Sequence, residues 1–114
     1  MAFIKNIEAE KELVLSEEVT VAKGQVVSKT LAQNDAISLT LFAFSKGEEI
    51  SEHSSHGDAM VQVFEGTAQL TIGGVKHIVT AGQTIVMPAE VPHALYAVED
   101  FKMLLTVVLP NETK

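Results

Sequence analysis

The sequence predicts an all-β domain, a sandwich or barrel built from short strands. Apolar and polar residues alternate in segments such as 36–44, with the period of a strand that has one buried face. Turns that contain glycine separate these segments at nearly regular spacing, most clearly at Gly73-Gly74. No segment carries a sustained apolar stripe with a 3.6-residue period, which excludes a helical bundle.

The expected strands follow one another along the chain. Residues 5–13 are expected to form either a short helical turn or an extended segment, and β-branched residues predict strands over 12–22 and 25–32. Pro88 and Pro92 predict a loop late in the chain. We expect a single domain over 1–114, with N-terminal strands in 1–35 and a barrel in 36–109. The barrel strands are expected at 36–44, 59–64, 68–72, 75–79, 84–87, 93–98 and 101–109.

The last expected strand, 101–109, is apolar on both faces. Met103 and Leu105 lie on one face, whereas Leu104 and Val108 lie on the other. One face can fill the barrel interior, and the other face then needs a second sheet or a second subunit to cover it. The pattern therefore predicts a homodimer.

The composition excludes several classes of protein. The formal net charge is −7 and the basic residues are all lysines, so we predict no binding to nucleic acid. The absence of cysteine removes disulfides, thiolate nucleophiles and cysteine-ligated metals. No apolar run approaches the roughly 20 residues that span a bilayer. The acidic start also lacks the apolar stretch of a signal peptide. We therefore expect a cytoplasmic protein with no membrane partner.

Glycine, histidine and proline recur at two sets of fixed intervals. Five residues separate Gly47 from His53, and Gly66 follows thirteen positions after that histidine. Five residues likewise separate Gly82 from Pro88, and four more precede His93. This spacing resembles the two motifs of the cupin superfamily over about residues 36–109. The resemblance implies a double-stranded β-helix, or jelly-roll, barrel.

In that family the motifs also hold a divalent metal, through His-x-His, a glutamate and a later histidine. The resemblance implies His53 and His93 as ligands, and such a set suits iron, manganese, nickel, copper or zinc. Ser55 stands at the second histidine position and Ala59 at the glutamate position, so the site is depleted. In the second motif Glu90 and Ala97 replace a glycine and an asparagine.

Two neighbours are candidates for the missing ligands. On a rigid strand His56 would face outward, but in a turn around Gly57 it could point inward as a third histidine. Asp58 could supply an oxygen ligand. The alternative is that His56 is a solvated turn histidine and that Asp58 is a turn former.

The barrel interior near these histidines is expected to suit a partly apolar small molecule. The predicted ligand-binding residues are Ser55, Asp58, Val61, Val63, Leu95 and Met103.

We therefore expect a small cupin barrel that binds a small molecule and, through the depleted histidine site, a divalent metal. The alternative is a metal-dependent enzyme, of isomerase or dioxygenase type, that acts on a small sugar or organic acid. The segment PHALYAVEDFKMLLTVVLP is similar in rhythm to small cupins that act on unsaturated uronate sugars. A third hypothesis is an interaction protein whose homodimer surface matters more than its cavity.

Overall fold

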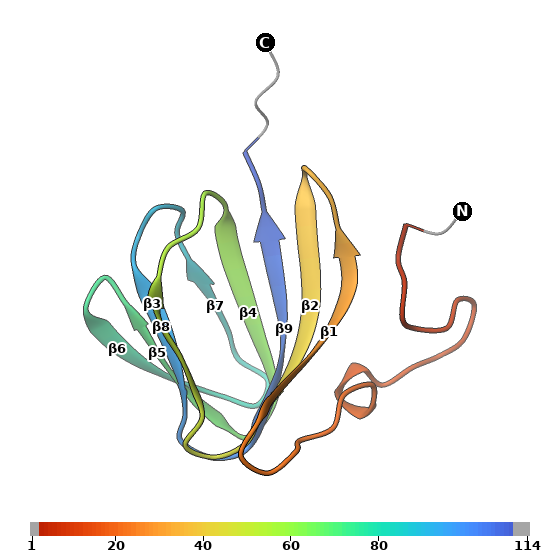
Figure 1. Ribbon diagram of the computed structural model, residues 1–114, viewed down its shortest axis with the longest axis horizontal. Coiled ribbons are helices and arrows are strands. Elements are labelled where there is room, and N and C mark those ends of the chain that lie inside the picture. Colours follow the sequence, from red (N-terminus) through yellow and green to blue (C-terminus); the bar gives the residue numbers. More distant parts are fainter. Residues whose placement is uncertain (1–2, 111–114) are drawn as a thin grey trace.

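Two antiparallel sheets pack face to face, as the alternating sequence pattern predicts. The structure, a computed structural model, describes residues 3–110, so both ends of the expected domain, 1–2 and 111–114, lie outside the described residues. The five-stranded sheet has the order β1-β2-β9-β4-β7 and the four-stranded sheet the order β3-β8-β5-β6 (Figure 1). The strands are β1 (Val26–Gln33), β2 (Ile37–Phe44), β3 (Glu49–His53), β4 (Asp58–Glu65), β5 (Thr67–Ile72), β6 (Val75–Thr80), β7 (Thr84–Met87), β8 (His93–Ala97) and β9 (Phe101–Val108).

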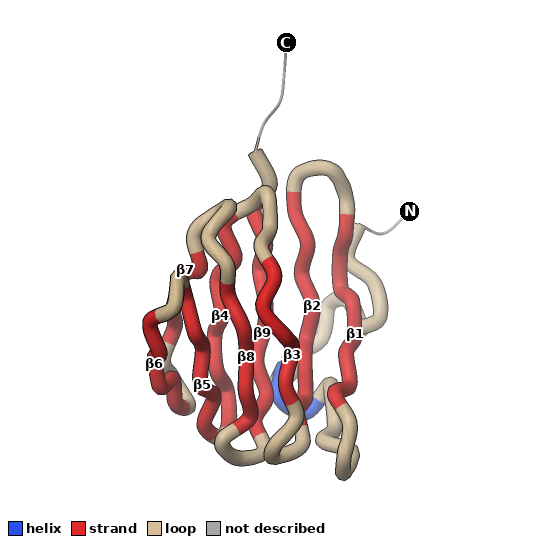
Figure 2. The backbone as a smooth tube through the Cα atoms, turned by 60° about the vertical axis from the view of Figure 1, so that its left-hand side comes forward, coloured by secondary structure: helices blue, strands red, loops and turns tan. Residues whose placement is uncertain are grey.

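The core lies between the two sheets, which Figure 2 shows as two layers with β3 and β8 in front of β9. Alternate residues of β4 and β9 point into it, so Val61, Val63 and Met103 are almost fully buried. Phe44 and Phe101 stack at the centre, with ring centroids 4.4 Å apart. Strands far apart in sequence, such as β4 and β9, are neighbours in one sheet. These features confirm the expected all-β jelly-roll fold.

Gly66 illustrates why the spaced glycines matter. Its φ is +80°, a left-handed conformation that side chains disfavour. A Cβ at this position would also collide with the backbone carbonyl of Asp100, at the turn into β9. The short turn between β4 and β5 therefore requires glycine for both torsion and space.

The prediction of a strand over 12–22 is wrong. This region instead contains a single 3₁₀ turn, η1 (Leu15–Glu17), within an irregular segment over residues 3–24 that we call the N-terminal strap. Residues 5–13 form neither the helical turn nor a continuous extended segment, because bends with positive φ at Asn6 and Glu10 interrupt them. In Figure 1 the strap, coloured red to orange, runs beside β1. Its β-branched and apolar residues serve tertiary packing rather than a sheet, a case in which context overrides propensity.

The strap covers part of the outer face of the five-stranded sheet. Val19 is buried there in a second core with Leu31, Leu41 and Ala43, and Leu104 of β9 packs against it. The strap thus covers part of the apolar outer face of β9. The sequence pattern had suggested a second sheet or a second subunit for this role. The homodimer stays a prediction.

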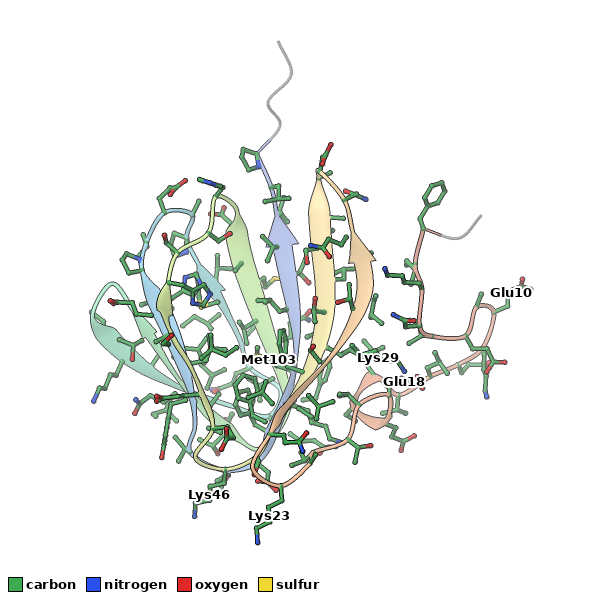
Figure 3. The ribbon with its side chains drawn as sticks, in the orientation of Figure 1. Glu10, Glu18, Lys23, Lys29, Lys46 and Met103 are labelled. Atoms are coloured by element: carbon green, nitrogen blue, oxygen red, sulfur yellow. The ribbon has the colours of Figure 1, made fainter. Side chains whose placement is uncertain are left out.

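Two lysines of the sheet hold the strap in place. Lys29 Nζ of β1 donates to the backbone carbonyl of Glu18 at 3.2 Å and lies 3.3 Å from its Oε1. Figure 3 shows Lys29 next to Glu18, which belongs to the strap. Lys102 Nζ of β9 donates to the carbonyl of Ser16 at 2.7 Å. Within residues 3–110, no helix has the length and apolar character needed to cross a membrane.

Candidate functional site

The two motif histidines meet on adjacent strands. His53 ends β3 and His93 begins β8, and the register of the antiparallel pair places them opposite each other. Their ring centroids lie 4.4 Å apart, and the ring planes make an angle of 72°. Residues forty positions apart in the sequence thus form one imidazole pair.

The ring nitrogens of the pair have defined roles. His53 Nδ1 lies 2.9 Å from the carbonyl oxygen of Ser51, and His93 Nδ1 lies 3.2 Å from the carbonyl oxygen of Val91. A carbonyl oxygen can only accept, so each Nδ1 carries the hydrogen and donates it. In the neutral imidazole, Nε2 then keeps its lone pair for a ligand or a metal ion.

The two histidines differ in burial. His93 is only 3% exposed, whereas His53 is exposed at the rim. Burial lowers the pKa of His93 from its ordinary value of 6.5, and the nearby His53 lowers this pKa further because two positive rings would repel each other. The hydrogen bond to Val91 acts in the opposite direction. Burial and the neighbouring ring therefore favour the neutral form of the His93 imidazole.

A cavity of about 140 Å³ adjoins the pair between the two sheets. Its wall is apolar apart from His53, Ser55 and His93. Three of the predicted ligand-binding residues, Ser55, Leu95 and Met103, line it. Figure 3 shows Met103 at the centre of the molecule. The remaining lining residues are Phe42, Ile50, Ala59, Met87, Leu105 and Val107.

The other predicted ligand-binding residues do not line this cavity. Val61 and Val63 point into the core, where they are 0% and 2% exposed, but they belong to the packed interior around Phe44 and Phe101. Asp58 is exposed, and its Oδ1 accepts a hydrogen bond from the backbone of Ala89 at 2.8 Å. That bond ties the start of β4 to the loop before β8, which matches the turn-former alternative for Asp58.

His56 does not join the imidazole pair. Residues 54–57 form an irregular bend, as Gly57 predicted, but the His56 side chain is 86% exposed. Its Nδ1 lies 2.8 Å from Glu90 Oε2. Among residues 3–110 no three His, Cys, Asp or Glu side chains are grouped to hold a metal ion. The three-histidine arrangement considered from the sequence is therefore not assembled.

Glu90 stands at the position that the motif gives to glycine, and its backbone has a conformation that favours glycine. Its φ is +66°, in the left-handed region. Its backbone N–H donates to the carbonyl of Ser55 at 2.8 Å. The loop around Glu90 is thus linked to the segment beside His53, and together these two loops frame the cavity on the histidine side.

Several lining residues were missed from the sequence although a signal exists. Ala59, at the motif's glutamate position, shares the inward face of β4 with Val61. Phe42 lies on the same face of β2 as the buried Phe44, two residues later. Ile50 lies on β3, a short strand of mostly exposed residues whose sequence shows a weak pattern. Alternation gives the face of these residues, so their inward direction was predictable.

Comparisons with known proteins agree with this geometry. A family model described as a cupin domain matches residues 40–109. A solved structure of a conserved protein of unknown function from Streptococcus pyogenes is 51% identical, with a TM-score of 0.96 over 97% of each chain. A cupin superfamily protein from Desulfitobacterium hafniense is 31% identical, with a TM-score of 0.90 over 96% of this chain and 100% of that one. KdgF from a Halomonas species, at 17% identity and a TM-score of 0.72 over 98% of this chain and 96% of that one, shares the fold. No curated protein matches the chain.

Proposed function

This chain belongs to the cupin family, and on that premise we propose that it binds a small molecule in the cavity between its sheets. The single observation that supports the proposal is an apolar cavity with two imidazoles at one side. Apolar walls with a few convergent polar groups are typical of ligand sites in proteins. The apolar wall would hold the body of the ligand, and His53 and His93 would hold its polar end.

Binding is favoured over catalysis by what the cavity wall contains. Among its described lining residues, the histidines are the only side chains with an ordinary pKa near neutrality, and the wall has no carboxylate. Ala59 places a methyl group where the family motif has a glutamate. A reaction that needs a carboxylate as acid, base or metal ligand would lack that group, and the two histidines would have to supply all proton transfer.

Filling the cavity tests the proposal. Val107 lines the cavity, whereas its neighbour Val108 on β9 is 57% exposed on the opposite face. Val107→Phe should occupy the cavity and abolish binding of small fragments, detected as chemical-shift changes of the cavity methyl groups. Val108→Phe is the matched control and should leave binding unchanged. Fragments that bind equally well to both variants would place the ligand site elsewhere.

A divalent metal at the imidazole pair is a second candidate, with a metal-dependent isomerase or dioxygenase as the corresponding function. The favouring observation is that both Nδ1 atoms donate to backbone carbonyls, which orients both Nε2 atoms as metal-binding imidazoles are oriented. Two imidazoles on one ion hold their ring centroids roughly 4.5–5 Å apart, given metal–nitrogen distances of about 2.0–2.1 Å. The observed 4.4 Å is close to that spacing.

The donor set fits such an ion only in part. Catalytic zinc sites usually have three protein ligands, and this pair supplies two. A bound ion would act as a Lewis acid on a ligand oxygen. We expect weak binding, which metal analysis of protein purified without a histidine tag would measure. His53→Ala and His93→Ala should each remove the metal, and the exposed His56→Ala should not. Metal that persists in the double variant of the pair would exclude this site.

A further inference from the structure

The size of the cavity limits its ligand. A volume of about 140 Å³ is close to that of an engineered cavity of roughly 150 Å³ that holds one benzene molecule. Ligand pockets for drug-sized molecules are larger, at about 300–1,000 Å³. A cavity of this volume therefore takes a molecule of about one six-membered ring.

The lining disfavours sugars. Three of its side chains are polar, and they are His53, Ser55 and His93. The Ser55 oxygen already accepts a hydrogen bond from the backbone N–H of Gly57 at 3.1 Å. A monosaccharide would bring several hydroxyls against apolar walls, and each buried hydroxyl without a partner is costly.

The lining also disfavours anions. None of the cavity-lining residues, all within the described chain, is a lysine, and the sequence has no arginine. The formal net charge of −7 adds an unfavourable field for an anion. A carboxylate buried in this cavity would lack a cation to pair with, and an unpaired buried charge is very costly.

The histidines determine which polar group the ligand presents. Nδ1 of His93 is engaged with Val91, so its Nε2 is left as an acceptor. His93 is buried, whereas His53 at the rim can reach water. No buried side-chain nitrogen or oxygen in the described chain lacks a partner, so Nε2 of His93 is open to the cavity rather than sealed. A ligand that fills the cavity covers this acceptor and has to supply a donor to it, whereas His53 at the rim keeps its access to water.

Given the proposed function, on which this inference rests, we infer that the ligand is a neutral molecule of about one ring with a largely apolar body. It donates one hydrogen bond, from a hydroxyl or an N–H group, to Nε2 of His93. Phenol has this chemistry, and toluene has the same shape without the donor.

The test is a titration of isotope-labelled protein at about pH 8, followed through the methyl groups of Leu95, Met103 and Val107. The probes are phenol, toluene, benzoate and glucose. Phenol should bind about tenfold or more tightly than toluene, because toluene covers the Nε2 acceptor of His93 without offering it a donor. Benzoate and glucose should produce no shifts at these methyl groups.

Variants assign the effect to His93. His93→Phe removes the acceptor and keeps an apolar ring, so phenol should lose its advantage over toluene. His77→Ala on β6, away from the cavity lining, should leave both affinities unchanged. The wild-type comparison of phenol with toluene stands even where His93→Phe does not fold.

The outcomes separate this inference from the proposed function. Equal binding of phenol and toluene, or preferred binding of benzoate, would overturn the ligand class while leaving the cavity as the binding site. The same holds if other fragments shift the cavity methyl groups and phenol does not. If no probe or fragment shifts them, both the ligand class and the proposed function are wrong.

Discussion

His53 and His93 are cross-strand partners whose rings lie 4.4 Å apart, one exposed and the other only 3% exposed. Both rings use Nδ1 in the same way, as a donor to a carbonyl two residues earlier in the chain. The pair is therefore symmetric in hydrogen bonding and asymmetric in solvation. Burial therefore couples the protonation of the His93 ring to folding.

The stability of the metal-free protein should fall as the pH is lowered through 6.5. The pKa of His93 is lowered in the folded state by burial and by His53, whereas in the unfolded chain it is about 6.5. Below that pH the unfolded chain binds a proton that the folded chain does not, so the free energy of unfolding decreases. The decrease stops once the pH is below the folded pKa. Urea denaturation from pH 8 to 5 measures this, and in His93→Gln the decrease should be smaller.

An NMR titration of His53→Ala tests the causes of that shift. Removing the neighbouring ring should raise the pKa of His93, because the repulsion is lost. Burial remains, so the pKa should stay below 6.5. A His93 pKa at or above that value in the wild-type protein would contradict the assignment of His93 as a buried neutral imidazole.

The motif glycines should differ in their tolerance of alanine. Gly66 and Gly82 have φ values of +80° and +89°, but only at Gly66 would a Cβ meet backbone, the carbonyl of Asp100. Gly82→Ala should cost about 1–2 kcal/mol for the left-handed conformation. Gly66→Ala should cost about 2–5 kcal/mol, since overpacking is added. Urea denaturation of both variants checks the order, and equal losses would contradict the steric reason.

Much of the barrel was predictable because alternation and glycine turns are local signals. The strands expected from residue 36 onward appear at nearly the expected positions, and His53 and His93 meet as the motif spacing implied. The irregular strap, found where a strand was expected over 12–22, was not predictable in this way. Val19 is buried by an outer sheet face formed from later strands, a tertiary partner that local propensity cannot report.

The candidate site shows where a local pattern stops being informative. Alternation correctly predicted that Val61 and Met103 face inward, but it does not give their depth along the barrel. Met103 lines the cavity, whereas Val61 belongs to the packed interior. The direction of His56 depends on Glu90, thirty-four residues later. A bend around Gly57 was foreseeable, whereas the side to which it directs the imidazole was not.

The Glu90→Gly variant should be more stable than the Glu90→Ala variant. Its φ of +66° is unfavourable for a side chain, and glycine removes that cost. Both variants lose the exposed contact with His56, so the difference between them isolates the backbone effect, about 1 kcal/mol. Compared with wild type, Glu90→Gly should range from neutral to about 1 kcal/mol more stable, because exposed ion pairs contribute about 0–1 kcal/mol. Urea denaturation measures all three proteins, and a more stable alanine variant would contradict the explanation.

Lys102 should contribute to stability by holding the N-terminal strap. Its side chain is 15% exposed, and Nζ donates to the carbonyl of Ser16 at 2.7 Å. Lys102→Met keeps the apolar stem but removes the donor, so the free energy of unfolding should fall by about 1–3 kcal/mol. Hydrogen exchange of the strap amides should accelerate more than that of β4. Lys23→Met is the control, since Lys23 points into solvent (Figure 3), and it should change stability by less than about 0.5 kcal/mol. Unchanged exchange in the strap of Lys102→Met would show that apolar packing around Val19, rather than the lysine, keeps the strap on the sheet.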